Sequence, residues 1–237
     1  MEIRGAAALV TGAGRGIGRA IALQIARAGA RVTAVSRTSS EIDSLAAEIR
    51  SAGGEAQAFP ADLRAPAAAA AAVAAAVAAH GRLQILVNNA GVGGVSNLAD
   101  TTDLDWDEIL STNLTAVFRV TRAALPHLTQ GGGHVFMISS LAGTNAIAGM
   151  SAYCASKAAL DHLAQCLMLE VRQQGVKVTT IAPGSVDTGF GGGPRPDGSW
   201  MLKPEDIART VVDLLGGRDE AHSSRVEMRP SRPQKRP

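Results

Sequence analysis

Short apolar runs, several of them rich in β-branched residues, alternate with longer helix-like stretches along nearly the whole 237-residue chain. The strand-like runs are residues 6–10, 31–36, 55–62, 83–91, 134–139, 176–184 and 225–230. A strand that is followed each time by a helix favours a parallel sheet whose two faces are both covered. The sequence therefore predicts an α/β fold, with one doubly wound parallel sheet of about seven strands and helices on both faces.

Seven strands in one sheet account for residues 1–228, so we expect a single domain there. The alanine-rich segment 65–80 predicts one covering helix, because alanine is the best helix former and Pro66 suits a helix start. Residues 229–237 carry four positive charges and three prolines, and we predict that they form a disordered tail.

Composition and cysteine usage exclude several classes of protein. A net charge of +2 gives no electrostatic attraction for nucleic acid or a membrane surface, and apart from the alanine tract no long uninterrupted apolar run predicts a transmembrane helix. The first residues run directly into a strand, which does not resemble a secretory signal. Cys154 and Cys166 lie in a predicted helix without metal-ligand spacing, so we expect reduced thiols, no metal site and a cytoplasmic protein.

A glycine turn lies where the first strand should meet the first helix. Thr11 is followed by Gly12, Gly16 and Gly18 in the pattern T-G-x-x-x-G-x-G. A helix start has unpaired N–H groups, and glycines let a pyrophosphate approach the backbone closely. The turn therefore predicts a Rossmann-type dinucleotide site.

The single tyrosine of the chain, Tyr153, precedes Lys157 by four residues, and a helix places both on the same face. Taken alone, the pair could be a surface tyrosine beside a solvated lysine. A cation about 5 Å from the phenol, at an effective dielectric constant of about 20, would stabilise the phenolate by roughly 3 kcal/mol. The spacing therefore indicates a tyrosine general acid/base whose pKa the lysine lowers.

Five motifs in this order resemble the compact, single-domain branch of the short-chain dehydrogenase/reductase family. They are TGxxxGxG, NNAG at 88–91, SS at 139–140, YxxxK at 153–157 and PG at 183–184, and the resemblance covers residues 5–215. It implies hydride transfer between a nicotinamide and a small carbonyl or secondary-alcohol substrate. The catalytic residues it implies are Asn113, Ser140, Tyr153 and Lys157.

Each of these residues has a role by resemblance. Ser140, with Ser139 as its adjacent rival, would hydrogen-bond the substrate carbonyl. Asn113 would hold a water in the proton relay behind Lys157, which would also bind the nicotinamide ribose. The full set of expected cofactor-binding residues is Gly12, Arg15, Gly16, Ile17, Gly18, Ser36, Arg37, Asp62, Leu63, Asn89, Ala90, Gly91, Tyr153, Lys157, Pro183, Gly184, Val186 and Thr188.

The end of the second strand indicates which nicotinamide cofactor binds. NAD enzymes usually place an acidic residue there for the ribose 2′-hydroxyl, but this chain has Ser36 followed by Arg37. A hydroxyl and a guanidinium would bind a 2′-phosphate, and Arg15 could reach the same phosphate. We therefore expect NADP(H).

The sequence leaves two alternative functions open, and it does not identify the substrate. A 3-oxoacyl-carrier-protein reductase would need a basic patch, yet residues 127–134 contain no Lys or Arg. A non-catalytic NADP-binding sensor typically loses the tyrosine or lysine, and this chain has both. In the loop at 189–202, which we expect to be a mobile lid, Phe190, Trp200 and Met201 could line an apolar pocket or pack the lid down. What this loop selects is not readable from the sequence.

By resemblance, the helices that hold Asn113 and Tyr153 pair across two-fold axes. We expect these helices to carry apolar residues beyond those needed to cover the sheet, namely Val117, Val120, Leu163 and Leu167. We therefore expect a homotetramer, with a dimer as the alternative.

Overall fold

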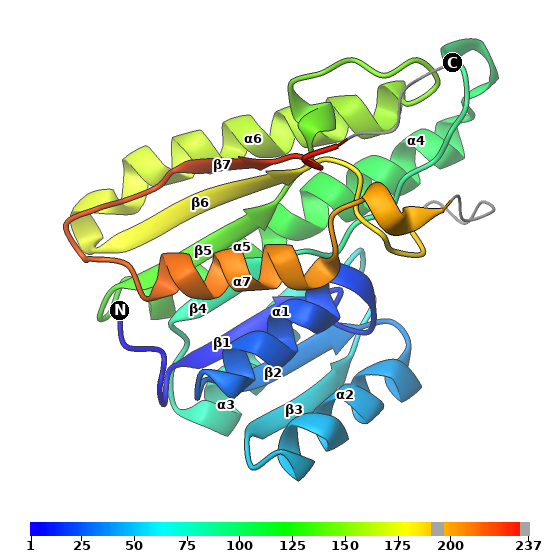
Figure 1. Ribbon diagram of the computed structural model, residues 1–237. Coiled ribbons are helices and arrows are strands. Elements are labelled where there is room, and N and C mark those ends of the chain that lie inside the picture. The colour runs from blue at the N-terminus through cyan, green and yellow to red at the C-terminus, as the bar shows by residue number, and fades with distance from the viewer. Residues whose placement is uncertain (191–196, 233–237) are drawn as a thin grey trace.

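The computed structural model describes residues 1–190 and 197–232 of the chain. Seven parallel strands form one sheet in the order β3-β2-β1-β4-β5-β6-β7, as predicted (Figure 1). The strands are β1 (Ala7–Thr11), β2 (Arg31–Ser36), β3 (Glu55–Pro60), β4 (Ile85–Asn88), β5 (Gly133–Ile138), β6 (Val176–Pro183) and β7 (Arg225–Met228). The chain adds strands on one side of β1 and then crosses to β4 on the other side. Such a switch point is where open parallel sheets bind ligands.

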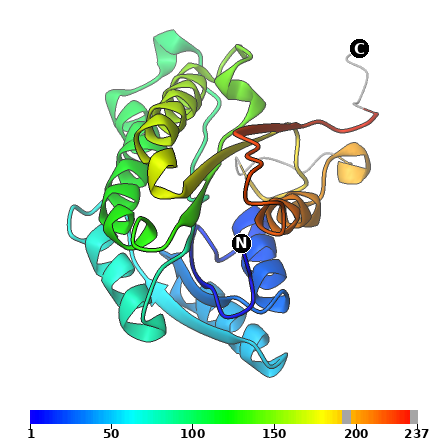
Figure 2. The same ribbon diagram turned by 90° about the vertical axis from the view of Figure 1, so that its left-hand side faces the viewer.

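Helices cover both faces of the sheet, as predicted (Figure 2). One face is covered by α1 (Gly16–Arg27), α2 (Ser39–Ser51) and α7 (Pro204–Leu215), and the other by α3 (Ala68–His80), α5 (Ala116–Leu128) and α6 (Ser151–Val171). The shorter α4 (Asp103–Leu110) packs against α6. Single helical turns complete the described chain at η1 (Leu98–Asp100), η2 (Ser111–Thr115), η3 (Leu141–Gly143), η4 (Arg172–Gln174) and η5 (Gly198–Trp200).

Strand side chains divide the core into two layers. In β1, Ala8 and Val10 pack toward α1 and α7, and Leu9 packs toward the opposite helices. This alternation follows from the two-residue repeat of a strand. Because both layers are apolar, β1 is buried along its whole length. The carboxyl ends of the central strands are thereby held in fixed positions beneath the loops that follow them.

The prediction that four apolar residues of α5 and α6 contact another subunit is wrong for three of them. Val117, Val120 and Leu167 are at most 4% exposed and belong to the core beneath α5 and α6, and Leu163 is half-buried. The spacing of these residues correctly predicted an apolar face on each helix, but that face packs against the sheet of the same chain. The large apolar side chains that point away from the sheet on these helices are Phe118 and Leu169.

The other sequence expectations concern segments and single residues. Cys154 and Cys166 are free thiols. No helix among residues 1–190 and 197–232 is long and apolar enough to cross a membrane. Of the tail predicted at 229–237, residues 233–237 lie outside the described residues, as do residues 191–196 of the predicted lid.

Candidate active site

A cavity of about 1000 Å³ opens at the carboxyl ends of the strands, around the switch point between β1 and β4. The segments that follow all seven strands contribute to its walls. All predicted cofactor and catalytic residues line it except Gly18 and Asn113, which lie behind the wall. The predicted residues on the wall are Gly12, Arg15, Gly16, Ile17, Ser36, Arg37, Asp62, Leu63, Asn89, Ala90, Gly91, Ser140, Tyr153, Lys157, Pro183, Gly184, Val186 and Thr188.

The glycine turn packs too tightly for any side chain at two positions. Gly12 has a φ of +62°, and a Cβ there would lie 2.8 Å from the Cα of Ala90. A Cβ on Gly18 would overlap the carbonyl oxygen of Gly12 and the Asn89 amide. The Asn89 side chain donates to the carbonyl oxygens of Thr11 (3.0 Å) and Gly12 (3.1 Å). The turn is thus fastened to the end of β4, and the N–H groups of the α1 amino terminus border the cavity.

One end of the cavity combines basic side chains with a carboxylate that the sequence did not single out. Arg15, Ser36 and Arg37 all line this end. Glu41, in the first turn of α2, also lines it, and its carboxylate lies against Gly14 beside the Ser36 hydroxyl. Acidic residues are common in first turns because they interact favourably with the helix dipole, so the sequence gave no reason to place Glu41 in a site.

A second residue missed by the sequence reasoning is Arg64. Its guanidinium binds the carboxylate of Asp62 with an Nη2–Oδ2 distance of 2.7 Å, and it also pairs with Glu108 at 3.2 Å. The hydrogen bond from Arg64 lowers the pKa of Asp62, and the charge of Arg37 lowers it further. Asp62 is therefore a fixed carboxylate on the cavity wall, beside the buried Leu63.

Tyr153 lies on α6 with its side chain only 8% exposed. Its ring packs against Phe190, with the ring centroids 5.6 Å apart. Burial raises the pKa of the Tyr153 phenol, while the neighbouring Ser140 side chain acts in the opposite direction. The prediction of a lowered tyrosine pKa is therefore wrong for this structure. The estimate from spacing counted the charge of the lysine and left out the desolvation of the phenol itself.

Lys157 is buried one turn along the same helix, with its Nζ 5.7 Å from the centre of the Tyr153 ring. The ammonium donates a hydrogen bond to the carbonyl oxygen of Ile138 at 2.9 Å. Burial lowers the pKa of Lys157 to about 8, and the nearby charge of Asp161 opposes this shift. The tyrosine and the lysine face the same cavity, as their spacing predicted, but both are desolvated.

Asn113 lies in η2, a turn of π-helix between α4 and α5. Its Oδ1 accepts from the Val92 N–H (2.8 Å), and its Nδ2 donates to the Val92 carbonyl (2.8 Å) and the Ser156 hydroxyl (3.0 Å). A Cβ on Gly91 would lie 3.3 Å from Asn113 Oδ1 and 3.7 Å from Lys157 Nζ, so both groups lie beside Gly91. Both the oxygen and the nitrogen of the Asn113 side-chain amide have protein partners, and the side chain lies behind the wall.

The two serines after β5 differ in their surroundings. Ser140 Oγ accepts a hydrogen bond from the Ala142 N–H at 3.1 Å and neighbours the Tyr153 phenol. Ser139 is buried, and its hydroxyl has no partner among the described residues. The geometry therefore favours Ser140 over Ser139 as the serine that works with the tyrosine.

The wall near Ser140 and Tyr153 is largely apolar. Phe190, Trp200 and Met201, from the loop expected to be a lid, all line the cavity there. Sequence reasoning missed most of the others in this part, including Leu141, Ala146, Ile147, Met150, Arg229 and Pro230. These residues come from loops whose sequences carry no periodic signal.

The short chain dehydrogenase family model matches residues 6–197. A sepiapterin reductase from Chlorobaculum tepidum is 37% identical over 86% of this chain and 87% of its own length. Among solved structures, a metagenomic short-chain oxidoreductase in complex with NADP is 38% identical, with a TM-score of 0.87 over 98% of this chain and 100% of that one. A short chain dehydrogenase from Burkholderia cenocepacia, also in complex with NADP, is 34% identical, with a TM-score of 0.88 over 97% of each chain.

Proposed function

The chain belongs to the short-chain dehydrogenase/reductase family, and from that premise we propose that it transfers a hydride between NADP(H) and a carbonyl or secondary-alcohol substrate. The observation that carries the proposal is that Ser140, Tyr153 and Lys157 line one cavity together with the glycine turn. One end of that cavity suits a dinucleotide, and the other end is an apolar space beside a tyrosine and a serine.

The residues that line the cavity suit NADP(H), although the Glu41 carboxylate lies at the same end as the two arginines. The space beside Gly12 and Gly16 admits a pyrophosphate to the amino terminus of α1. Arg15 and Arg37 would hold a 2′-phosphate, with Ser36 as a hydroxyl donor. Two similar solved structures contain NADP, which supports the same choice. Bound there, the nicotinamide supplies the hydride in reduction or accepts it in oxidation.

Tyr153 and Ser140 would act on the oxygen of the substrate. In reduction, the Ser140 hydroxyl hydrogen-bonds the carbonyl oxygen, and the Tyr153 phenol donates its proton to that oxygen as negative charge develops there. Because burial raises the phenol pKa, Tyr153 is protonated at neutral pH and ready to act as the acid. In oxidation the same phenol has to lose its proton first.

Lys157 and Asn113 would act behind the tyrosine. The pKa of Lys157, about 8, keeps most of its ammonium charged at neutral pH, where it stabilises the phenolate that proton transfer leaves. The Asn113 side chain ties η2 to the segment after β4 and to α6, beside Lys157. We propose that a relay water is held by the backbone of this π-helical turn, because the Asn113 side chain already has its partners.

Replacing Tyr153 by Phe tests the proposal. We expect Tyr153→Phe to bind NADPH normally, because the ring still packs against Phe190. Its kcat for carbonyl reduction should fall by about 10²–10⁴-fold, the usual contribution of a general acid. Ketones, diketones, sugars and a 3-oxoacyl thioester should be assayed by NADPH oxidation. A Phe variant with near-normal kcat would contradict the role given to Tyr153.

The adjacent serines supply a matched control. Ser140→Ala should lower kcat strongly, whereas Ser139→Ala should leave it nearly unchanged. Turnover restricted to the 3-oxoacyl thioester would identify a 3-oxoacyl-carrier-protein reductase. Tight NADPH binding without turnover of any substrate would instead support a non-catalytic sensor.

A further inference from the structure

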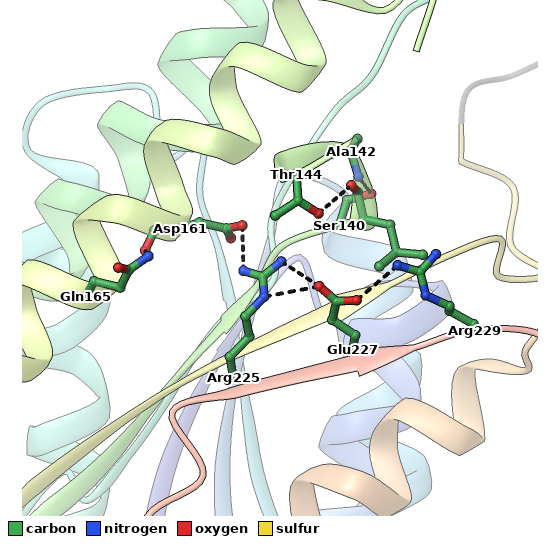
Figure 3. A network of polar contacts seen from close by, with 9 residues as sticks. Ser140, Ala142, Thr144, Asp161, Gln165, Arg225, Glu227 and Arg229 are labelled. Carbon is green, nitrogen blue, oxygen red and sulfur yellow. Dashed lines mark hydrogen bonds and ion pairs between the residues drawn. The ribbon is translucent and has the colours of Figure 1, made fainter. Parts of the chain in front are cut away.

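A chain of ion pairs runs from α6 along β7 (Figure 3), and its last residue, Arg229, lines the cavity. Asp161 on α6 pairs with Arg225 (2.7 Å), Arg225 with Glu227 (3.3 Å), and Glu227 with Arg229 (3.0 Å). Residues 225, 227 and 229 fall on one face because successive strand side chains point to opposite faces. We call these four residues the β7 charge ladder.

The inner end of the β7 charge ladder is buried. The Asp161 side chain is only 5% exposed, and Asp161 lies one helical turn beyond Lys157. Its carboxylate also lies against Gly143, just after the Ser140 turn. Removing the partner of a buried carboxylate is costly, so Arg225 is held firmly by this contact. The ladder is therefore anchored at the helix that carries Tyr153.

The outer end of the ladder lies on the cavity wall. The Gly184 N–H donates to the Met228 carbonyl oxygen at 2.8 Å, which fastens this segment to the loop after β6. A Cβ on Gly184 would lie 3.1 Å from the Leu141 side chain and 3.4 Å from Pro230. Arg229 and Pro230 therefore line the cavity beside the residue that follows Ser140.

Arg229 is a positively charged residue on this part of the wall, whereas its ion-pair partner Glu227 does not line the cavity. Among the described residues that line the cavity from position 138 onward, the charged ones are Lys157 and Arg229, and both are cations. Only Nη2 of the Arg229 guanidinium donates to Glu227, and within residues 1–190 and 197–232 its remaining donors have no protein partner. A guanidinium edge in this position matches the two oxygens of a carboxylate or phosphate.

We propose that Arg229 is a substrate-recognition residue and that the carbonyl or alcohol substrate carries a carboxylate or phosphate group. The proposal rests on the oxidoreductase function proposed above. Asp161, Arg225 and Glu227 are positioning residues: they hold the Arg229 guanidinium at the wall while the apolar surface near Tyr153 accepts the rest of the substrate.

The test compares charged substrates with their neutral counterparts under NADPH. The panel contains 2-oxo, 3-oxo and 4-oxo acids with their methyl esters, and phosphorylated ketones with the free hydroxyketones. The unmodified protein should prefer at least one charged member by about tenfold or more in kcat/KM. Arg229→Gln should lower kcat/KM for that member by about 10–100-fold, mainly through KM, and change the neutral counterpart by less than about twofold. Arg229→Lys should restore part of the loss.

Arg218→Gln is the matched control, because Arg218 is 84% exposed and does not line the cavity. It should leave both substrate classes unchanged. Equal use of charged and neutral substrates by the unmodified protein would overturn the proposal, as would equal losses for both classes in Arg229→Gln. If the methyl esters are reduced, and this reduction is lost in Tyr153→Phe, the proposed oxidoreductase function would still stand although the proposal for Arg229 had failed.

A binding measurement covers the case in which none of these compounds is reduced. The NADPH complex should be stabilised against thermal unfolding by an oxo acid or a phosphorylated ketone more than by its neutral counterpart, and Arg229→Gln should remove that difference. Equal thermal shifts for all compounds would overturn the proposal for Arg229. NADPH binding without turnover would separately count against the oxidoreductase function.

Discussion

Opposite charges meet at the end of the cavity where we expect the cofactor 2′-phosphate. Arg37 would attract this phosphate, and its removal should cost NADPH about 1.5–3 kcal/mol. Arg37→Ala should therefore lower the preference for NADPH over NADH by about 10–100-fold. The measurement is kcat/KM for both cofactors with one substrate. Equal use of both cofactors by the unmodified protein would contradict the assignment.

A substitution of Glu41 should have the opposite effect to Arg37→Ala. Its carboxylate lies beside Ser36 and would repel the same phosphate. Glu41→Gln should shift the preference in the opposite direction, toward NADPH, while keeping the size of the side chain. A shift toward NADH would show that Glu41 acts in some other way than by its charge.

Lys157 makes stability depend on pH in the alkaline range. Its pKa is about 8 in the folded protein against about 10.5 in the unfolded chain. The unfolded chain therefore binds more protons between these values, and the free energy of unfolding rises with pH across that window. Between pH 7 and 10 the unmodified protein should gain about 2–3 kcal/mol relative to Lys157→Met, because a pH unit is worth about 1.4 kcal/mol. Urea unfolding at both pH values would measure this gain, and parallel curves would contradict it.

The sequence predicted which residues meet in the site better than it predicted their electrostatics. Helical spacing was enough to place Tyr153 and Lys157 together. The sign of the tyrosine pKa shift depended on burial, to which Phe190 from a distant loop contributes. Arg64, Glu41 and Arg229 were missed because turns and a distant strand bring them to the cavity, and none of them lies in a motif.

At the scale of elements, apolar patterning located every strand and almost every helix. The predicted boundaries of 31–36 are those of β2. Residues 105–128 read as one continuous helix-like stretch in the sequence. In the structure they divide at the π-helical turn of residues 111–115, because one extra residue in a turn leaves the apolar repeat nearly unchanged. Patterning also identified the apolar faces of α5 and α6 without showing that the sheet itself covers them.

The pairing of β5 with β6 buries a histidine that should make the fold sensitive to acid. His134 stacks on Phe136, bonds the Thr179 hydroxyl at 2.8 Å, and has its pKa lowered to about 3 by burial first and then by the charge of His222. The unfolded chain takes up this proton near pH 6.5, so the free energy of unfolding falls as pH drops from 6.5 toward 3.

His134→Gln keeps a polar side chain for Thr179 but does not titrate. Between pH 7 and 5 the unmodified protein should lose about 2 kcal/mol more than this variant. His162→Gln, at an exposed position on α6, is the control and should follow the unmodified protein. Denaturant unfolding at both pH values is the measurement. An equal loss in His134→Gln would show that other groups govern the acid sensitivity.

At the scale of the whole molecule, the homotetramer stays a prediction, now with different contact residues. Phe118 and Leu169 are 43% and 63% exposed on the outer sides of α5 and α6. If these helices pair across two-fold axes, Leu169→Glu should lower the mass measured by light scattering from tetramer to dimer or monomer. Ala47→Glu, exposed on α2 on the opposite side of the sheet, should leave the mass unchanged. A monomer mass for the unmodified protein would refute the prediction.

The packing of α7 on α1 imposes an order on events during synthesis. The two helices lie side by side over the same face of the sheet (Figure 1), and Ile207, Val211 and Leu215 complete the apolar layer that contains Ile21 and Ile25. About 180 residues separate them, so at about 5–20 residues per second the ribosome needs about 10–40 s to bring the second helix after the first. Throughout that interval the helix that begins at the glycine turn has one apolar side uncovered. We therefore expect the apolar side of α1 to be open to chaperones until α7 has been synthesised.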